Sequence, residues 1–163
     1  MELVTAAVEG GHRILLFSQF TSMLELLAKR LDAEGISHFT LQGSTPKPVR
    51  AELVRRFNGG EVSVFLISLR AGGTGLNLTA ADVVIHYDPW WNAAAQDQAT
   101  DRAHRMGQEN QVTVFRLVTS HTVEENILKL QERKRDLADS VVTEGTGSFA
   151  GLTREDLLAM LDT

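Results

Sequence analysis

The chain has 163 residues, 43% of them hydrophobic and 23% charged, with a formal net charge of -5 and no cysteine. This composition indicates one soluble globular domain and excludes disulfides, thiolate metal sites and a cysteine nucleophile. Because no apolar run reaches about 18 residues and no signal-peptide pattern is present, we expect an intracellular protein that does not contact a membrane. The negative charge gives no global support to nucleic-acid binding, although a basic groove can lie on an acidic body.

Apolar runs that resemble strands alternate along the chain with segments of helical periodicity. Strands are predicted over 14–18, 37–42, 62–68, 82–88 and 112–118, and helices over 21–35, 47–58, 92–106 and 122–142. The run from Val62 to Ile67 is typical of an inner strand of a parallel sheet, buried on both faces by crossover helices. The predicted fold class is therefore α/β, a three-layer α/β/α sandwich with a mostly parallel central sheet and a long C-terminal helix.

The C-terminal part follows a different pattern. The last predicted helix begins with Thr122 and Glu125 in capping-box spacing, and Val123, Ile127 and Leu130 belong to one apolar stripe that we expect to be buried. After it, residues 143–151 have the composition of a loop and residues 153–161 that of a short capped helix. We therefore expect a domain over residues 1–142, followed by a loop and a short helix over 143–163.

In open parallel sheets, ligands bind beyond the carboxyl ends of the strands. The segments at that position are SQF (18–20), QGST (42–45), SLRAGGTGLNL (68–78) and DPWWN (88–92). The glycine-rich segment is consistent with phosphate binding through backbone amides or, equally, with a surface turn. The chain lacks the GxxxxGK(S/T) string of a P-loop, and Leu78 stands where a GxGxxG fingerprint needs its third glycine. No self-sufficient triphosphate or dinucleotide site is therefore expected.

The other segments each admit two interpretations. SQF and QGST offer neutral donors that fix a nucleic-acid backbone, but such residues are also turn formers and helix caps. Arg50, Arg55 and Arg56 either add charge near QGST or belong to a solvated helix face. One of Trp90 and Trp91 should be buried and the other presented, either to stack on a nucleic acid or to cover a neighbouring domain.

Other kinds of chemistry have little support. The five histidines show no metal-ligand spacing, and no GxSxG elbow accompanies them, so no metal site and no triad are predicted. Paired carboxylates are missing from the strand ends. Asp88 stands alone there, and we expect it to stabilise the Pro-Trp-Trp turn.

The segment DRAHRMGQ (101–108) closes a predicted helix. Arg102 and Arg105 are spaced i and i+3, so both guanidiniums leave one side of the helix. Interaction with the helix dipole explains about 0.3 to 1 kcal/mol for each cation. A guanidinium placed against a transferring phosphoryl group is worth about 10³ to 10⁵ in rate, which favours a phosphate supplied from outside this chain.

In this order and at these spacings, RILLFSQFTSMLELL, LQGST, FLISLRAGGTGLNLTAADVVIHYDPWWN and DRAHRMGQ resemble the second motor lobe of Swi/Snf-type ATPases, within the superfamily 2 helicase-like proteins. The resemblance covers about residues 10 to 140. It implies a RecA-like lobe that works beside a first lobe carrying the Walker A and Walker B motifs. ATP and Mg²⁺ would lie between the lobes, bound mainly by the first, and double-stranded DNA would run across both.

The resemblance also assigns residues. Arg102 and Arg105 would be catalytic arginine fingers, and the helix from Thr122 would brace the first lobe. Nucleotide-binding residues would be Gly73, Gly75 and Gln108; DNA-binding residues would be Ser18, Gln19, Gly43, Ser44, Thr45, Gly72, Thr74, Asn77, Trp90 and Trp91. Ala93 stands where the family commonly has proline, so the entry into that helix is expected to be less rigid.

The leading hypothesis is the second lobe of an ATP-dependent translocase on double-stranded DNA, with a DNA-bound protein as a possible remodelling target. The start at Met1 resembles a cut into a helix, so we expect a lobe taken from a longer protein and inactive by itself. A non-enzymatic nucleic-acid or protein binding module is the alternative. A lobe of an RNA helicase is disfavoured, because those sixth motifs resemble HRxGR and Gln108 stands here.

Overall fold

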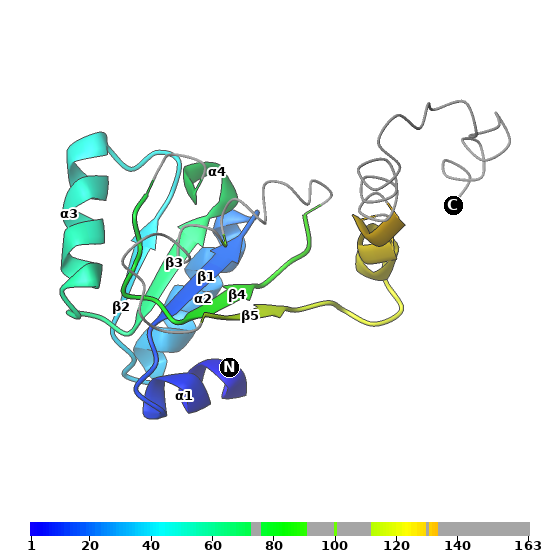
Figure 1. Cartoon of the computed structure of the whole chain (residues 1–163), viewed down its shortest axis with the longest axis horizontal. Helices are drawn as coiled ribbons and strands as arrows, with labels where there is room; N and C mark the ends of the chain where they lie inside the picture. The colour runs from blue at the N-terminus through cyan, green and yellow to red at the C-terminus, as the bar shows by residue number, and fades with distance from the viewer. Residues whose placement is uncertain (73–75, 91–99, 101–111, 130, 134–163) are drawn as a thin grey trace, which may run out of the picture.

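The computed structural model of this chain describes residues 1–72, 76–90, 100, 112–129 and 131–133 (Figure 1). In this described part, five strands form one parallel sheet in the order β2-β3-β1-β4-β5. The strands are β1 (Ile14–Ser18), β2 (His38–Leu41), β3 (Val64–Ser68), β4 (Val83–His86) and β5 (Thr113–Arg116). The helices are α1 (Glu2–Glu9), α2 (Thr21–Ala33), α3 (Lys47–Asn58) and the single turn α4 (Leu69–Gly72).

The inner strands are buried throughout. Every residue of β1, β3 and β4 is buried, as the apolar runs predicted for strands covered on both faces. By contrast, β5 lies at an edge of the described sheet and exposes Thr113 and Arg116 at its two ends. The inner strands therefore contribute a large share of the apolar core.

Two hydrophobic clusters cover the two faces of the sheet. Val4 of α1 and Leu24, Leu27 and Leu31 of α2 pack on one face against alternate strand residues such as Leu16. On the other face, Phe57 of α3 packs with the intervening strand residues, among them Leu15, Phe17 and Phe65. Fully burying a side chain of this size contributes about 1.5 to 3 kcal/mol. The predicted three-layer α/β/α arrangement is therefore confirmed.

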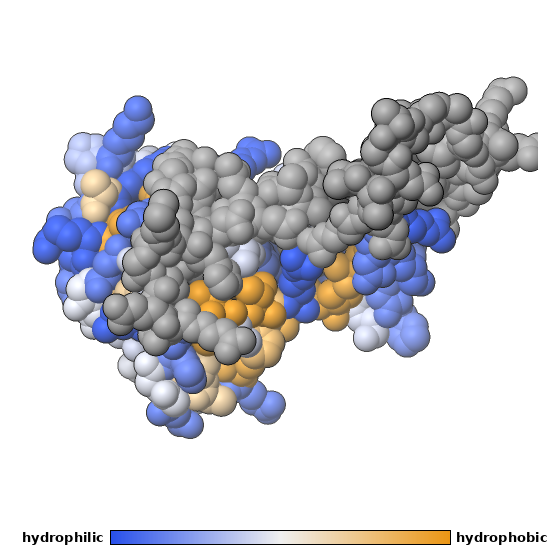
Figure 2. Space-filling view, in the orientation of Figure 1, coloured by the Kyte–Doolittle hydropathy of each residue, from blue (hydrophilic) through white to orange (hydrophobic). Residues whose placement is uncertain are grey.

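The hydropathy of the surface differs between regions of the molecule. In the view of Figure 2, hydrophilic residues cover α3 and the described helical residues beyond Thr122, while apolar surface gathers near β5. No helix within the described residues is long and apolar enough to cross a bilayer.

The end of α2 confirms a predicted stop signal. The helix ends at Ala33, and Gly35 follows with φ +69°, a conformation that glycine adopts without steric cost. The amide of Ile36 bonds the carbonyl of Leu31 at 2.9 Å, and that of Gly35 bonds Asp32 at 3.1 Å. These bonds satisfy carbonyls of the last turn, as in a Schellman motif.

Some boundaries differ from the predictions. β2, β3, β4 and β5 are each shorter than the predicted runs, because apolar residues such as Val62 remain buried beyond the paired segment. The segment interpreted as a glycine loop begins with the helical turn α4, where the Ser68 hydroxyl accepts a hydrogen bond from the Ala71 amide at 3.3 Å. A single turn is too short to show helical periodicity, so α4 was not predicted.

The C-terminal helix is described at residues 123–129 and 131–133. Its cap differs from the predicted box: the Thr122 hydroxyl accepts from the Glu124 amide at 3.2 Å, and the Glu124 carboxylate, not Glu125, accepts from the Thr119 amide at 2.7 Å. Val123 is 69% exposed and so does not belong to a buried stripe. The predicted loop and short helix over 143–163 lie outside the described residues, as does all of the predicted helix over 92–106 except Thr100.

Candidate functional site at the carboxyl edge of the sheet

All described strands are parallel, so their carboxyl ends lie along one edge of the sheet. We call this the carboxyl edge, and it carries residues 18–20 after β1, 42–45 after β2, 68–72 after β3 and 87–90 after β4. The opposite side, where the strands begin, is called the amino edge. The segments singled out from the sequence are thus brought to one side of the molecule by strand direction alone.

Asp88 joins the ends of β1 and β4. Its carboxylate accepts a hydrogen bond from the hydroxyl of Ser18, and its other oxygen accepts from the backbone amide of Gln19 at 2.9 Å. Ser18 is fully buried and Asp88 is 5% exposed. The Ser18 hydroxyl therefore points at Asp88 and not at the surface, a geometry that suits orienting Gln19 better than direct contact with a phosphate.

The environment of Asp88 alters its acidity. Burial raises the pKa of Asp88 above its ordinary value, because a carboxylate is poorly solvated there. Hydrogen bonds from Ser18 and Gln19 oppose that rise in the pKa, and the negative charge of Glu124 adds to it. Asp88 was expected to stabilise the Pro-Trp-Trp turn; the two contacts described for its carboxylate join it to Ser18 and Gln19, which lie 70 and 69 residues away.

The segment after Asp88 is held from two sides. Gln19 donates from Nε2 to the carbonyl of Pro89 at 3.4 Å, and Gln131 of the C-terminal helix donates from Nε2 to the carbonyl of Trp90. Gln131 is 7% exposed, and Trp90 is half-buried. Gln131 was not predicted as a site residue, although a polar residue four positions after Ile127 on an apolar face was a usable signal. Trp91 lies outside the described residues.

The loop after β2 is braced by Arg50 of α3. Its guanidinium donates from Nε to the carbonyl of Thr45 at 2.7 Å and from Nη2 to the carbonyl of Gly43 at 2.6 Å. The Thr45 hydroxyl accepts from the amide of Gln42 at 3.1 Å. Arg50 thus shapes the loop, a role that was not predicted, and Gly43 and Ser44 remain exposed at its tip.

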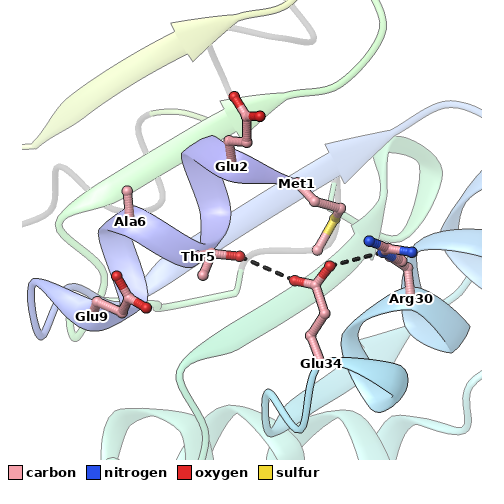
Figure 3. A pocket seen from close by; sticks show the side chains of 7 residues that line it. All are labelled: Met1, Glu2, Thr5, Ala6, Glu9, Arg30 and Glu34. Carbon is pink, nitrogen blue, oxygen red and sulfur yellow. Dashed lines mark hydrogen bonds and ion pairs between the residues drawn. The ribbon is translucent and has the colours of Figure 1, made fainter.

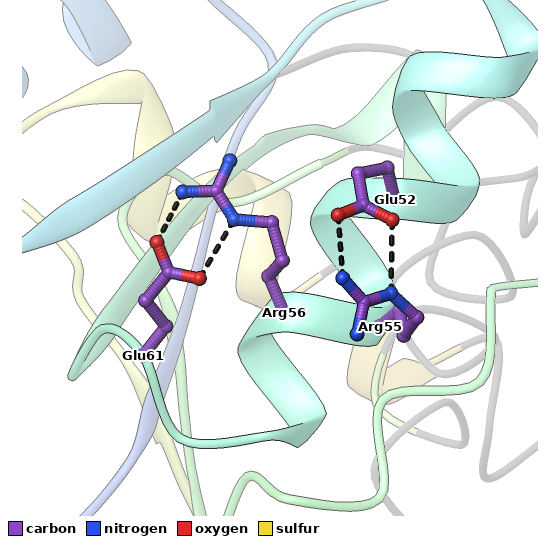
Figure 4. Close-up of polar contacts among 4 residues, drawn as sticks. All are labelled: Glu52, Arg55, Arg56 and Glu61. Atoms are coloured by element: carbon purple, nitrogen blue, oxygen red, sulfur yellow. Dashed lines mark hydrogen bonds and ion pairs between the residues drawn. The ribbon is translucent and has the colours of Figure 1, made fainter.

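Arg55 and Arg56 lie further along α3, toward the amino edge (Figure 4). Arg55 pairs with Glu52 at 2.6 and 2.9 Å, and Arg56 pairs with Glu61 while its guanidinium lies 4.7 Å from the centre of the Phe39 ring. Hydrogen bonding to Arg55 lowers the pKa of Glu52. The interpretation of these two arginines as a solvated helix face fits this geometry.

The glycine-rich segment is only partly described. Gly72 ends α4, and Gly73, Thr74 and Gly75 lie outside the described residues. Asn77 is exposed, and its carbonyl accepts from Nδ2 of Asn58 at 2.9 Å. Residues before and after Asn77 are buried, so its exposure to solvent is local.

Arg102, Arg105 and Gln108 also lie outside the described residues. The described residues that flank them in the sequence are Thr100 and Val112, and Thr100, two positions before Arg102, is helical and half-buried. Its hydroxyl lies 2.9 Å from Nε2 of His86, the last residue of β4.

Two pockets lie away from the carboxyl edge. One has a volume of about 610 Å³ and lies between α1 and the end of α2, where Glu34 accepts from Thr5 at 3.0 Å and from Arg30 at 2.8 Å (Figure 3). The other, of about 450 Å³, is lined by residues that include Arg13, Asn58 and Asp82. None of their described lining residues was predicted to bind nucleotide or DNA.

A profile of the helicase conserved C-terminal domain family matches residues 1–107. The chain belongs to this family. More narrowly, it is a C-terminal RecA-like lobe of the Swi/Snf type in superfamily 2, as the ordered strings implied.

Relatives support this placement. An uncharacterized ATP-dependent helicase of Mycoplasma pneumoniae is 39% identical over 163 residues, covering 99% of this chain and 16% of the relative. Helicase SWR1 of Saccharomyces cerevisiae is 44% identical over 92% of this chain and 10% of the relative. Chromatin-remodeling ATPase INO80 of Sclerotinia sclerotiorum is 45% identical over 89% of this chain and 9% of the relative.

A solved structure gives the same result. The crystal structure of the C-terminal part of the Fun30 ATPase domain matches with a TM-score of 0.76 and 35% identity, over 79% of this chain and 42% of that one. This helicase C-terminal lobe therefore spans less than half of the solved structure, and at most 16% of the relatives named above.

Proposed function

We propose that this helicase C-terminal lobe is the second half of an ATP-dependent translocase on double-stranded DNA. The observation that carries the proposal is the gathering of SQF, QGST and DPW at one edge of a lobe of this family. Its absent first lobe, the DNA and a DNA-bound remodelling target are the proposed partners, and an intracellular location belongs to the same proposal.

The residues of this chain suit only part of a nucleotide site. Without a GxxxxGK(S/T) string, the chain offers the guanidiniums of Arg102 and Arg105, with Gln108 and the amides of Gly73 and Gly75 as further donors. Bound ATP supplies the transferable phosphoryl group, and Mg²⁺ neutralises its charge. The role of the two arginines is to donate hydrogen bonds to phosphate oxygens that another lobe holds.

Substitution of the arginines tests this role. In the two-lobed protein, Arg102→Ala or Arg105→Ala should lower ATP turnover by at least about a hundredfold, because each removes a cation from the transferring phosphate. Arg55→Ala, an exposed arginine paired with Glu52, is the matched control and should leave turnover unchanged. Near-normal turnover in both finger variants would remove the assignment.

The half-site itself has a separate test. The 163-residue chain alone should hydrolyse ATP no faster than a buffer blank. Clear turnover by the chain alone would contradict the requirement for a first lobe.

The DNA-binding assignment rests on neutral groups at the carboxyl edge. Gln19, exposed Gly43 and Ser44, and Thr45 offer backbone and side-chain groups suited to phosphates, and Gly72, Thr74, Asn77, Trp90 and Trp91 belong to the same proposed surface. Ser18 contributes by orienting Gln19 through Asp88. Ser44→Glu should weaken duplex binding through like-charge repulsion, whereas Ser37→Glu, an exposed serine before β2 at the amino edge, should not.

A binding module without enzymatic activity is the alternative. A GxxxxGK(S/T) string followed by an acidic DExH-like string immediately upstream in the native reading frame would favour the motor. Stimulation of ATP turnover by duplex DNA, and not by RNA, would separate a DNA translocase from an RNA helicase.

A further inference from the structure

His86 has a position set by the core. It is the last residue of β4, 1% exposed, and its imidazole stacks on Phe17 with ring centres 5.5 Å apart and planes 20° apart. Phe17 is its partner in the parallel β1–β4 register and is also buried. With one ring held against the other inside the sheet, the imidazole nitrogens point in defined directions.

A polar ring at this place needs an explanation. The rest of β4 is Val83, Val84 and Ile85, and a buried polar group is costly unless it is hydrogen-bonded. Phenylalanine, whose ring is one atom larger, could also stack on Phe17 and would bring no polar atom. What histidine adds is Nε2, which lies 2.9 Å from the hydroxyl of Thr100. A hydroxyl both donates and accepts, so this bond forms with either imidazole tautomer.

The place of Thr100 in the sequence gives this contact its meaning. Thr100 lies 14 residues after His86 and only two before Arg102, at the entrance to DRAHRMGQ. Asp88, two residues after His86, holds Ser18 and Gln19. The end of β4 therefore anchors the loop after β1 on one side and the entrance to the arginine segment on the other.

We propose that His86 is a positioning residue for the two arginines: through Thr100, it fixes where the chain enters DRAHRMGQ and so where Arg102 and Arg105 meet the phosphate. This inference rests on the proposed function, which assigns Arg102 and Arg105 to the phosphates of ATP. A misplacement of about 1 Å can cost about a hundredfold in rate, so we expect loss of a bond two residues before Arg102 in the sequence to have a measurable effect.

The test uses near-isosteric variants in the two-lobed protein. Thr100→Val removes the hydroxyl and keeps the shape, and it should lower kcat for ATP by about tenfold while KM and the unfolding temperature change little. Thr100→Ser retains the hydroxyl and should restore most of the rate. His86→Phe should reproduce Thr100→Val. If His86→Phe fails to fold, the half-buried Thr100 still provides the test.

A matched control comes from the amino edge. Thr5 is half-buried and its hydroxyl bonds Glu34 at 3.0 Å, so Thr5→Val also removes one threonine hydrogen bond. That variant should keep wild-type kcat. An equal fall in kcat for Thr5→Val and Thr100→Val would overturn the inference, because the effect would then be one of general stability.

Limited trypsin digestion of the 163-residue chain gives a readout independent of turnover. Cleavage after Arg102 should be severalfold faster in Thr100→Val than in wild type or Thr5→Val. If Thr100→Val keeps the wild-type kcat while Arg102→Ala is impaired, the positioning role of His86 is overturned and the proposed function is not. Near-normal turnover in both Arg102→Ala and Arg105→Ala would instead overturn the proposed function. Wild-type cleavage after Arg102 in Thr100→Val would also count against the anchor.

Discussion

The two edges of the sheet hold their polar groups in different ways. At the carboxyl edge, the buried Ser18 and Asp88 join segments 70 residues apart, while Arg50 braces a loop that is close to it in sequence. Toward the amino edge, exposed charged pairs within α3 or just beyond it join residues close in sequence, such as Arg55 with Glu52. Longer-range contacts are exceptions there, among them His12 with Asp82, where the histidine is half exposed, and Thr5 with Glu34.

This contrast indicates different roles for the polar groups at the two edges. Exposed ion pairs contribute little to stability, since water screens them and two long side chains lose freedom. Removing one partner of a buried hydrogen bond leaves a donor without an acceptor, which costs more. We therefore expect polar groups at the carboxyl edge to determine loop geometry, and charged pairs near the amino edge to serve mainly solubility.

Removing the carboxylate of Asp88 should have the largest effect on stability. Asp88→Ala leaves the Ser18 hydroxyl and the Gln19 amide without their acceptor, so the free energy of unfolding should fall by about 2 to 4 kcal/mol. Urea unfolding of the chain measures this loss. Glu61→Ala, which breaks an exposed pair, is the control, and equal losses at both positions would contradict the contrast between the edges.

Removing the guanidinium of Arg50 should have a smaller effect. Arg50→Met loses two hydrogen bonds to loop carbonyls, and the free energy of unfolding should fall by about 1 kcal/mol. Affinity for duplex DNA should fall as well, because the QGST loop loses its brace. Arg55→Met is the matched control; if it weakens DNA binding as much as Arg50→Met does, charge and not loop shape is the cause.

Acidification should separate wild type from Asp88→Asn by a smaller margin. Because burial raises the pKa of Asp88 in the folded state, its favourable contribution is complete below the ordinary aspartate pKa and is lost as pH rises through the raised value. From neutral pH down through that window, wild type should gain stability relative to the variant. Urea unfolding at several pH values measures the difference, and a relative loss for wild type would mean that the pKa is lowered.

Salt should have the smallest effect. Raising NaCl from about 0.1 M to about 1 M shortens the Debye length from about 10 Å to about 3 Å and screens exposed pairs. Because the exposed pair of Arg55 with Glu52 contributes little to stability even before it is screened, the unfolding midpoints of wild type and Arg55→Met should coincide at both salt concentrations. If wild type is more stable than Arg55→Met in low salt and this difference disappears in high salt, the pair of Arg55 with Glu52 contributes more to stability than proposed.

Parts of the fold were predictable because their signals are local. Continuous apolar runs predicted β1 and β3, since inner parallel strands bury both faces, and Gly35 marked the end of α2. α4 was missed because one helical turn has no periodicity. Val123 was misplaced because apolar periodicity shows that a stripe exists but not what covers it, and this residue, the first of the helix, is 69% exposed.

In the candidate site, too, features with a local sequence signal were predictable and contacts between distant residues were not. Strand direction alone predicted that SQF, QGST and DPWWN would share an edge, and the order of the strings predicted the family. The partners of Arg50 and Gln131 were not predictable, because a carbonyl acceptor such as that of Gly43 or Trp90 carries no side-chain signal in the sequence.

The sequence by itself determined the α/β class, the parallel sheet and the membership of the Swi/Snf-type C-terminal lobes, because apolar periodicity and ordered strings are properties of neighbouring residues. Only the tertiary structure decided that Asp88 faces Ser18 and that His86 faces Thr100. Those contacts depend on the register of β1 against β4 and on where a later segment returns to the sheet. Both follow from packing between residues distant in the chain.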